Sequence, residues 1–257
     1  MVAPAPALGL EGRVVIVTGA AGGIGGAAAT LALANGMKVL AVDIVAARLA
    51  SFVAASGGGD AIAAHVADLG DSAQIPGIVA AAVERFGRVD ALVHAAALMV
   101  REFDIEKIDD EHWDRQYRIN ERGSWYLVRD VAETMRRQGG GGSIVMFASA
   151  GAFTGGLGGS WVYSATKGAI ITMVRGFAKT YAPHGIRVNA ISPGTTNTGM
   201  FTDGVPPERI AQINEMVPLR RVAEPSEQAS AALFLVSDWA SYVSGVTLDV
   251  DGAWLTR

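Results

Sequence analysis

Short apolar runs alternate with longer segments of helical period along almost the whole chain. The runs are rich in Val, Ile and Ala, a composition typical of strands that are buried on both faces of a parallel sheet. We expect seven strands, at 14–17, 39–42, 61–66, 91–93, 144–147, 188–191 and 246–250. Segments of helical length and composition lie between them, at 24–35, 74–86, 112–137 and 162–181.

This alternation predicts a doubly wound α/β domain, with a seven-stranded parallel sheet flanked by helices. Successive strand–helix–strand units are right-handed, so their helices cover both faces of the sheet. Glycine clusters at 57–59 and 139–142 fall where a helix ends and the next strand begins, and we interpret them as loops. We find no internal repeat and no Pro/Ser-rich boundary, so we expect one domain over residues 12–257.

Two segments fall outside this alternation. Residues 1–11 begin with Ala-Pro repeats and predict an extended N-terminal arm. Residues 193–218 form the only long stretch that we interpret as irregular, with Gly199, Gly204 and the pair Pro206 and Pro207. Long loops inside compact domains are usually functional, so we expect a substrate lid at about 194–218.

Composition and charge narrow the possible classes of function. The chain has 257 residues, of which 50% are hydrophobic, enough for a large core. The net charge of -4 is mild and Lys and Arg are scattered, which argues against nucleic-acid or anionic-membrane partners. The chain has no cysteine, which excludes disulfides, thiolate metal sites and a Cys nucleophile. We expect a cytoplasmic protein with a small-molecule substrate and no metal.

The first expected strand runs directly into a glycine-rich turn at Thr18–Gly25, and an Ala-rich helix follows. Glycine allows such a turn to approach a pyrophosphate, which then binds at the positive end of the helix dipole. This context predicts a Rossmann-type dinucleotide site formed by Gly19, Gly23, Ile24 and Gly25. The alternative is that the glycines only permit close helix packing.

Acidic residues follow the second and third strands. Asp43 comes 18 residues after Gly25, close to the spacing at which a carboxylate accepts hydrogen bonds from the adenosine ribose. The same carboxylate repels a 2′-phosphate, so we expect NAD, with NADP less favoured, although Arg48 lies near enough in sequence to reach a phosphate. Asp68 is placed for the adenine edge. The alternative for either acid is that it caps a turn or a helix.

Tyr163 and Lys167 stand four residues apart at the start of an expected helix and therefore share one face. A cation about 4 Å from the phenol, at an effective dielectric constant of ~20, contributes about 4 kcal/mol, or roughly three pKa units. This pairing makes a phenolate near neutral pH feasible. If Tyr163 and Lys167 stood alone, the simpler interpretation would be an ordinary exposed pair on a helix surface.

The pair does not stand alone, and the sequence resembles the short-chain dehydrogenase/reductase family over nearly its whole length. The resemblance rests on the turn at 18–25, Asn120, Ser149, Tyr163 and Lys167, Pro193-Gly194 with Thr198, and Asp251-Gly252. It implies an oxidoreductase that transfers a hydride between NAD and a secondary alcohol or ketone.

The same resemblance implies a role for each residue. Tyr163 acts as general acid or base and Ser149 holds the substrate oxygen. Lys167 lowers the pKa of Tyr163 and binds the nicotinamide ribose, and Asn120 positions a water of a proton relay. The remaining cofactor contacts are expected at Ala95, Pro193, Gly194, Thr196 and Thr198.

Three positions depart from the usual family pattern. The family commonly has Asn-Asn-Ala-Gly after the fourth strand, where this chain has His94-Ala95-Ala96-Ala97, and we interpret His94 as a buried structural residue. Ser149 precedes Tyr163 by 14 residues, one more than is common, which places an insertion in the following loop. The alternative puts Ala150 in the serine position. Thr196 stands where Val or Ile is frequent.

The substrate is less clearly indicated. We expect Met200, Phe153 and Trp161 to form an apolar pocket, and no Arg/Lys pair is concentrated in these loops. We therefore expect a neutral, moderately hydrophobic secondary alcohol; the alternative is that these side chains only pack the lid. The alternatives are an NADPH-dependent 3-oxoacyl thioester reductase and a non-catalytic dinucleotide-binding regulator.

Aromatic residues are abundant on two expected helices. Trp113, Tyr117, Trp125 and Tyr126 exceed what one contact with a sheet needs. The family resemblance implies that these helices pair across a two-fold axis, with homotetramers common. We expect a homo-oligomer, and the sequence does not separate dimer from tetramer.

Overall fold

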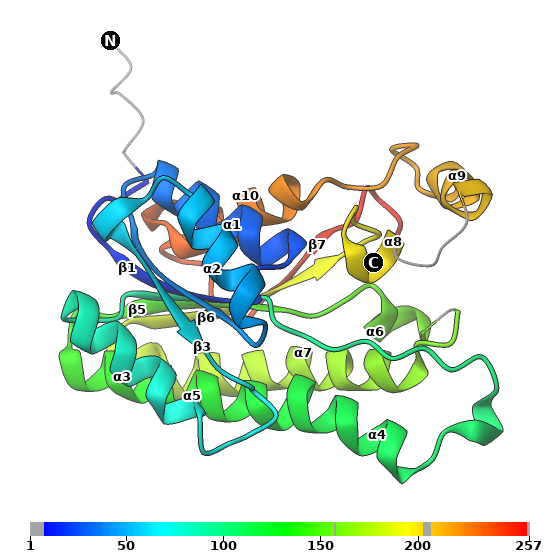
Figure 1. Ribbon diagram of the computed structural model, residues 1–257, viewed down its shortest axis with the longest axis horizontal. Coiled ribbons are helices and arrows are strands. Elements are labelled where there is room, and N and C mark those ends of the chain that lie inside the picture. Colours follow the sequence, from blue (N-terminus) through cyan, green and yellow to red (C-terminus); the bar gives the residue numbers. More distant parts are fainter. Residues whose placement is uncertain (1–7, 157, 203–206, 256–257) are drawn as a thin grey trace.

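The strands form one parallel sheet, as the sequence predicts. The computed structural model describes residues 8–156, 158–202 and 207–255 (Figure 1). The strand order is β3-β2-β1-β4-β5-β6-β7, and every neighbouring pair is parallel. The strands are β1 (Val14–Thr18), β2 (Lys38–Asp43), β3 (Ile62–Val66), β4 (Ala91–His94), β5 (Gly142–Phe147), β6 (Ile186–Pro193) and β7 (Thr247–Val250). The order reverses between β1 and β4, which opens a crevice at the carboxyl ends of these strands.

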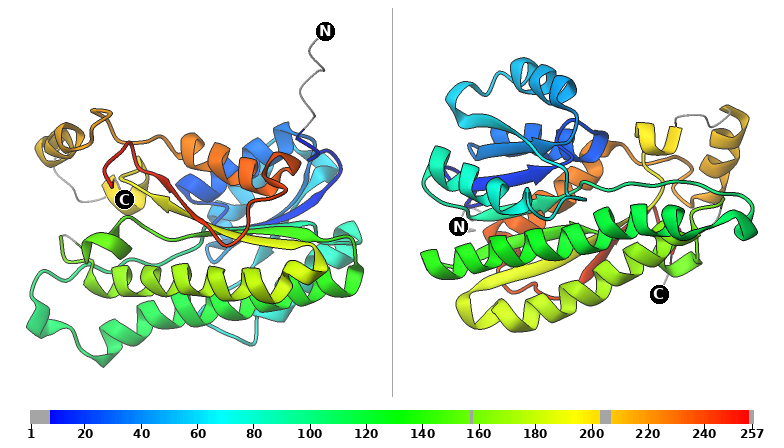
Figure 2. Two further views of the ribbon diagram at one scale, coloured as in Figure 1. Left: turned by 180° about the vertical axis from the view of Figure 1, so that it is seen from behind. Right: turned by 60° about the horizontal axis from the view of Figure 1, so that its bottom comes forward.

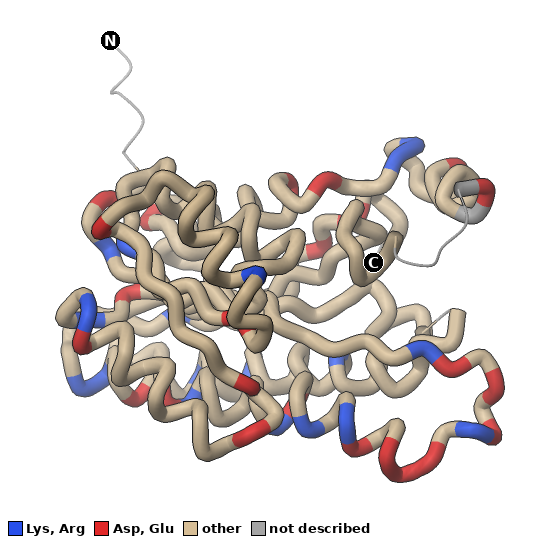
Figure 3. The backbone as a smooth tube through the Cα atoms, viewed as in Figure 1, with Lys and Arg blue, Asp and Glu red and all other residues tan. Residues whose placement is uncertain are grey.

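Helices cover both faces of the sheet. Figure 1 shows α1 (Gly23–Ala34), α2 (Ala46–Ala55) and α10 (Pro225–Val236) on one face. The other face carries α3 (Ile75–Phe86), α5 (Ser124–Gln138) and α7 (Trp161–Tyr181). Lys and Arg positions are mixed with Asp and Glu positions along the described parts of the backbone (Figure 3).

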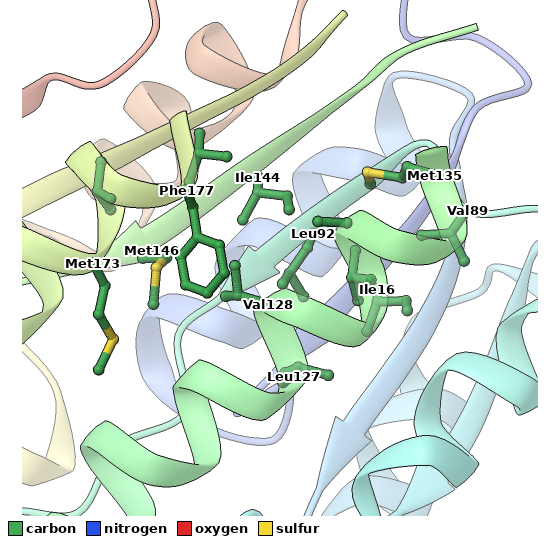
Figure 4. Packing of buried hydrophobic residues seen from close by; sticks show 14 of the residues in the cluster. Ile16, Val89, Leu92, Leu127, Val128, Met135, Ile144, Met146, Met173 and Phe177 are labelled. Atoms are coloured by element: carbon green, nitrogen blue, oxygen red, sulfur yellow. The ribbon is translucent and has the colours of Figure 1, made fainter. Parts of the chain in front are cut away.

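Each face of the sheet has its own hydrophobic core. Under α1 and α10 the buried residues of α1 are small, namely Gly25, Ala28, Ala29 and Ala32, so this helix packs closely. Under α5 and α7 larger side chains pack together, with Phe177 and Val128 of the helices beside Ile144 and Met146 of the sheet (Figure 4). Burying each such side chain stabilises the fold by about 1.5–3 kcal/mol.

The helical segment expected at 112–137 is divided by a π-helical stretch. It consists of α4 (Asp110–Tyr117), the π-helix η3 (Arg118–Gly123) and α5. A Cβ on Gly123 would overlap the carbonyl oxygen of Leu69, so glycine at this position lets the π-helix contact the backbone of Leu69 closely. Such π segments often occur at functional sites, and this one contains Asn120.

The prediction of an irregular 193–218 segment is wrong in part. Its described residues include α8 (Gly199–Thr202) and α9 (Pro207–Met216), while 203–206 lie outside the described residues. We had interpreted the Pro206-Pro207 pair as a loop signal, but proline is compatible with the first turn of a helix. Ile210, Ile213 and Met216 then recur at helical spacing.

The described part of the arm expected at 1–11 packs against the domain. Residues 1–7 lie outside the described residues, whereas Leu10 is buried and Leu8 packs against the core under α1. The Leu8 carbonyl also accepts a hydrogen bond from the Asp238 N–H at 3.0 Å. Two apolar side chains therefore attach this segment to the domain. None of the described helices combines the length and apolarity that a bilayer-spanning helix requires.

Candidate active site

A cavity of about 1300 Å³ lies at the carboxyl edge of the sheet. It is bordered by the glycine turn after β1, by the loops after β2 to β6 and by the lid helices α8 and α9. All the residues that the sequence nominates for the cofactor line it: Gly19, Gly23, Ile24, Gly25, Asp43, Asp68, Ala95, Tyr163, Lys167, Pro193, Gly194, Thr196 and Thr198.

The glycine turn is shaped by backbone contacts that a side chain would block. Gly19 has φ +67°, and a Cβ there would stand 3.0 Å from the Cα of Ala96. A Cβ on Gly25 would overlap the carbonyl of Gly19, and one on Gly23 would lie 2.5 Å from Thr198. The turn therefore exposes backbone N–H groups at the start of α1, which fits the pyrophosphate of a dinucleotide.

Asp43 is held in place by two backbone donors. Its Oδ2 accepts from the Ala21 N–H and its Oδ1 from the Val45 N–H, both at 3.0 Å. The N-terminus of α2 has no side-chain cap, so Asp43 does not act as one. Each carboxylate oxygen keeps a further lone pair for ribose hydroxyls. Arg48 also lines the cavity.

Asp68 combines two of the expected roles. Its Oδ1 accepts a hydrogen bond from the Gly70 N–H at 2.7 Å, which closes a turn after β3. The residue also lines the cavity. Both interpretations left open by the sequence are therefore compatible with its position.

Asn120 lies behind the cavity wall and not on it. Its side chain is buried, with Oδ1 accepting from the Leu98 N–H and Nδ2 donating to the Leu98 carbonyl, both at 2.7 Å. Nδ2 also lies 3.2 Å from the hydroxyl of Thr166. The amide therefore tethers the loop that follows β4 to the π-helix.

Ser149, Tyr163 and Lys167 meet at the centre of the cavity. Ser149 and Tyr163 hydrogen-bond through their side chains, which places the hydroxyl of Ser149, and not Ala150, beside the phenol. The ammonium of Lys167 lies 5.5 Å from the ring centroid of Tyr163 and donates to the Phe147 carbonyl at 2.7 Å.

The electrostatics of the pair differ from the expectation. Burial raises the pKa of Tyr163 to about 12, against smaller lowering effects of the Ser149 hydrogen bond and of Arg101. Burial also lowers the pKa of Lys167 to about 8. The cost of placing a phenolate in this site exceeds the attraction of nearby cations. Tyr163 is therefore a neutral phenol at pH 7 and is prepared to donate a proton.

His94 links the cofactor turn to the π-helix. Its Nδ1 lies 2.7 Å from the Thr18 hydroxyl and its Nε2 lies 2.7 Å from the Ser124 hydroxyl. The Ser124 hydroxyl donates its proton to the Asn120 carbonyl, so it accepts a hydrogen bond from Nε2–H of His94. The Thr18 hydroxyl accepts from the Ala96 N–H and donates its own proton to Nδ1. Burial, helped by the charge of Lys167, lowers the pKa of His94 to about 3. The imidazole is therefore neutral and structural.

The segment after β6 completes the cofactor side. The Pro193 carbonyl accepts from the Ala150 N–H at 3.0 Å, and a Cβ on Gly194 would lie 2.7 Å from the Cα of Asp251. Thr196 is buried and forms an isolated parallel bridge with Ala223. These contacts fix the backbone that faces the cavity.

Two of the three expected substrate residues do not line the cavity. Met200 does, but Phe153 and Trp161 do not. Phe153 follows the cavity residue Gly151 by two positions in α6 (Gly151–Thr154), and Trp161 precedes the cavity residue Tyr163 by two positions in α7. Residues two positions apart in a helix point about 200° apart. Sequence periodicity could have shown this.

Among the cavity residues that sequence reasoning missed are Arg101, Phe103, Ile213 and Trp254. Arg101 and Phe103 follow the carboxyl end of β4, a position that itself indicates a site. Ile213 lies in the unrecognised helix α9, and Trp254 follows the Asp251-Gly252 pair noted in the sequence.

Comparison with known proteins agrees with this geometry. Residues 19–254 match the family model described as enoyl-(acyl carrier protein) reductase. The chain is 34% identical over 244 residues to the 3-oxoacyl-(acyl-carrier-protein) reductase FabG of Thermotoga maritima, covering 95% of this chain and 98% of that protein.

Two crystal structures of Brucella melitensis proteins are also similar. One is a short-chain dehydrogenase/reductase described as a glucose/ribitol dehydrogenase, with TM-score 0.90, 34% identity and coverage of 96% of this chain and 98% of that one. The other is a 3-ketoacyl-(acyl-carrier-protein) reductase complexed with NADH, with TM-score 0.88, 33% identity and coverage of 95% and 99%.

Proposed function

The chain belongs to the short-chain dehydrogenase/reductase family, and from this premise we propose that it is an NAD-preferring oxidoreductase that interconverts a secondary alcohol and its ketone. The observation that carries the proposal is the meeting of Ser149, Tyr163 and Lys167 in one cavity with the glycine turn. Nicotinamide supplies the hydride chemistry when it is bound. The protein supplies binding, orientation and proton transfer.

Each residue then has a defined task. In ketone reduction the hydroxyl of Ser149 holds the carbonyl oxygen, and the neutral phenol of Tyr163 donates its proton to that oxygen. In alcohol oxidation the same phenol must first lose its proton. The ammonium of Lys167 lies 5.5 Å from the ring centroid of Tyr163, and Asn120 keeps the loop after β4 in place.

Asp43 supports the preference for NAD. Its two backbone hydrogen bonds orient the carboxylate at the carboxyl end of β2, where the adenosine ribose of a dinucleotide lies in this fold. The 2′-phosphate of NADP at the same place is repelled by the like charge of Asp43, which favours binding of NAD over NADP.

For the substrate, we propose a secondary alcohol on a moderately hydrophobic skeleton. Met200, Phe201 and Met216 of the lid and Trp254 give the cavity an apolar wall. We expected a neutral molecule because no pair of cations is concentrated in the lid loops. Arg101, from the loop after β4, adds a cation to the wall of this cavity.

A second candidate is a 3-oxoacyl thioester reductase that uses NADPH. The similarity to FabG and the description of the family model favour it, and Asp43 argues against it. A non-catalytic regulator is disfavoured by the intact set of Asn120, Ser149, Tyr163 and Lys167 in the fold.

We also propose a cytoplasmic homo-oligomer, with a tetramer favoured by family resemblance. The two helices α5 and α7 lie side by side on the outside of the molecule (Figure 2). An apolar groove there includes Trp125, which is 47% exposed and whose ring centroid lies 4.8 Å from that of Phe177. Such a patch is typical of a self-association surface.

The decisive experiment is a panel of secondary alcohols and ketones assayed with NAD(H) and NADP(H) by nicotinamide absorbance. We expect turnover with NAD and apolar alcohols. Turnover confined to 3-oxoacyl thioesters with NADPH favours the second candidate. NADH binding without turnover of any substrate favours the regulator.

A further inference from the structure

Resting on the proposed function, we propose that Arg101 binds a carboxylate on the substrate, so that this enzyme acts on hydroxy acids or keto acids with an apolar body. The inference concerns the substrate end of the cavity. It adds a recognition site that neither the sequence pattern nor the family resemblance assigned.

The backbone around Arg101 is held on both sides. Leu98 is bound through its N–H and carbonyl to the buried amide of Asn120. The Val100 N–H donates to Oε1 of the fully buried Gln116 at 3.0 Å, and the Glu102 N–H donates to the Gly159 carbonyl at 3.0 Å. A loop fixed at three points presents the Arg101 side chain to the cavity in a defined place.

Arg101 lies at the catalytic end of that cavity. It lines the space together with Ser149 and Tyr163, and its guanidinium is 3.6 Å from the position of a Cβ on Gly158. Its charge also favours the ionised form of Tyr163, which places it within electrostatic reach of the phenol.

No described carboxylate forms an ion pair with Arg101. The neighbouring Glu102 accepts a hydrogen bond from the Asp104 N–H at 2.9 Å and belongs to its own turn. Among the described residues, the acids that line the cavity are Asp43 and Asp68, at the ends of β2 and β3 on the cofactor side. No described carboxylate therefore neutralises the charge of Arg101 beside Ser149 and Tyr163.

The apolar wall determines the rest of the ligand. Met200, Met216 and Trp254 line the same cavity as Arg101, so a molecule with an apolar body and one acid group matches both surfaces. A single guanidinium has the planar fork that pairs with a carboxylate through two hydrogen bonds. We therefore assign a carboxylate to this position.

The test compares a hydroxy acid with its primary amide, which has nearly the same shape but no charge. Suitable pairs are 3- and 4-hydroxycyclohexanecarboxylate and their carboxamides, assayed with NAD in the unmodified protein and in Arg101→Gln, Arg101→Lys and Arg101→Glu. Arg137→Gln is the matched control, because Arg137 is exposed near the end of α5, at the opposite edge of the sheet.

We expect kcat/KM to favour the acid over the amide by about 10-fold, because a charge-assisted pair is strong but this side chain is exposed to solvent. Arg101→Gln reduces this ratio to near one because the KM for the acid rises. Arg101→Lys retains part of the preference for the acid, and Arg101→Glu reverses it. Added salt lowers the acid-to-amide ratio of kcat/KM in the unmodified protein, because it screens the ion pair. Arg137→Gln leaves it unchanged.

Equal efficiency with acid and amide in the unmodified protein overturns the proposal while leaving the alcohol dehydrogenase activity intact. An equal loss for both in Arg101→Gln also overturns it, since Arg101 then acts on Tyr163 or on the loop. If no alcohol is turned over, the proposed function fails. Calorimetric titration of the keto acid and keto amide into the NADH-loaded protein then applies the same acid-to-amide comparison without turnover.

Discussion

Replacing His94 by Asn should remove an acid-sensitive contribution to folding stability. The pKa of His94 is lowered from 6.5 to about 3 by burial and by Lys167. The unfolded chain therefore takes up a proton below about pH 6.5, whereas the folded protein does so only near pH 3. The stabilisation is present above pH 6.5 and is lost as the pH falls through this window.

The size of the effect follows from linkage. Each pKa unit corresponds to about 1.4 kcal/mol, so the full difference of roughly 3.5 units amounts to about 5 kcal/mol below pH 3. Between pH 7 and pH 5 the free energy of unfolding should fall by about 2 kcal/mol through His94. At pH 7 His94→Asn should itself destabilise by about 1–3 kcal/mol, because the shorter amide cannot reach both the Thr18 and Ser124 hydroxyls.

The assay is urea unfolding followed by tryptophan fluorescence at half-unit steps from pH 7.5 to 5, at fixed protein concentration. The free-energy difference between the unmodified protein and His94→Asn should shrink by about 2 kcal/mol over this range. His184→Asn, at an exposed position, is the control and should keep the parental slope. Parallel curves for the parent and His94→Asn would refute a neutral, buried His94.

Three further predictions concern the active site and the assembly. Tyr163→Phe should lower kcat at least about 100-fold with little change in NADH affinity; in the parent, since the pKa of Tyr163 is raised to about 12, alcohol oxidation should accelerate from pH 6 to 8 while ketone reduction stays nearly constant. Retained turnover would remove Tyr163 from the mechanism. Asp43→Ser should erase most of a preference for NAD of about 100-fold, chiefly through a higher KM for NAD; equal use of NADP by the parent would contradict the argument. Trp125→Asp should reduce the oligomer's mass in light scattering at unchanged circular dichroism, and an unchanged mass would exclude the groove between α5 and α7 as the interface.

Local patterns in the sequence determined the fold class and the order of its elements. The five central strands are buried along most of their length and have a composition typical of a sheet covered on both faces, and the Thr18–Gly25 turn joins a strand to a helix. Spacing along the chain likewise nominated Asp43, Tyr163 and Lys167, because neighbours on one helix or at one strand end remain neighbours after folding. The boundaries failed where proline was interpreted only as a breaker, at α9.

Only the tertiary structure decided how distant residues act on one another. The sequence suggested that Lys167 would bring the pKa of Tyr163 toward neutrality, but burial by residues from many elements raises it. The place of Arg101 after β4 indicates a nearby site, but the sequence does not show which way its loop runs; the hydrogen bonds of that loop to Asn120, Gln116 and Gly159 make it a cavity residue. Desolvation and long-range contacts depend on the packing of the whole chain, which no local pattern contains.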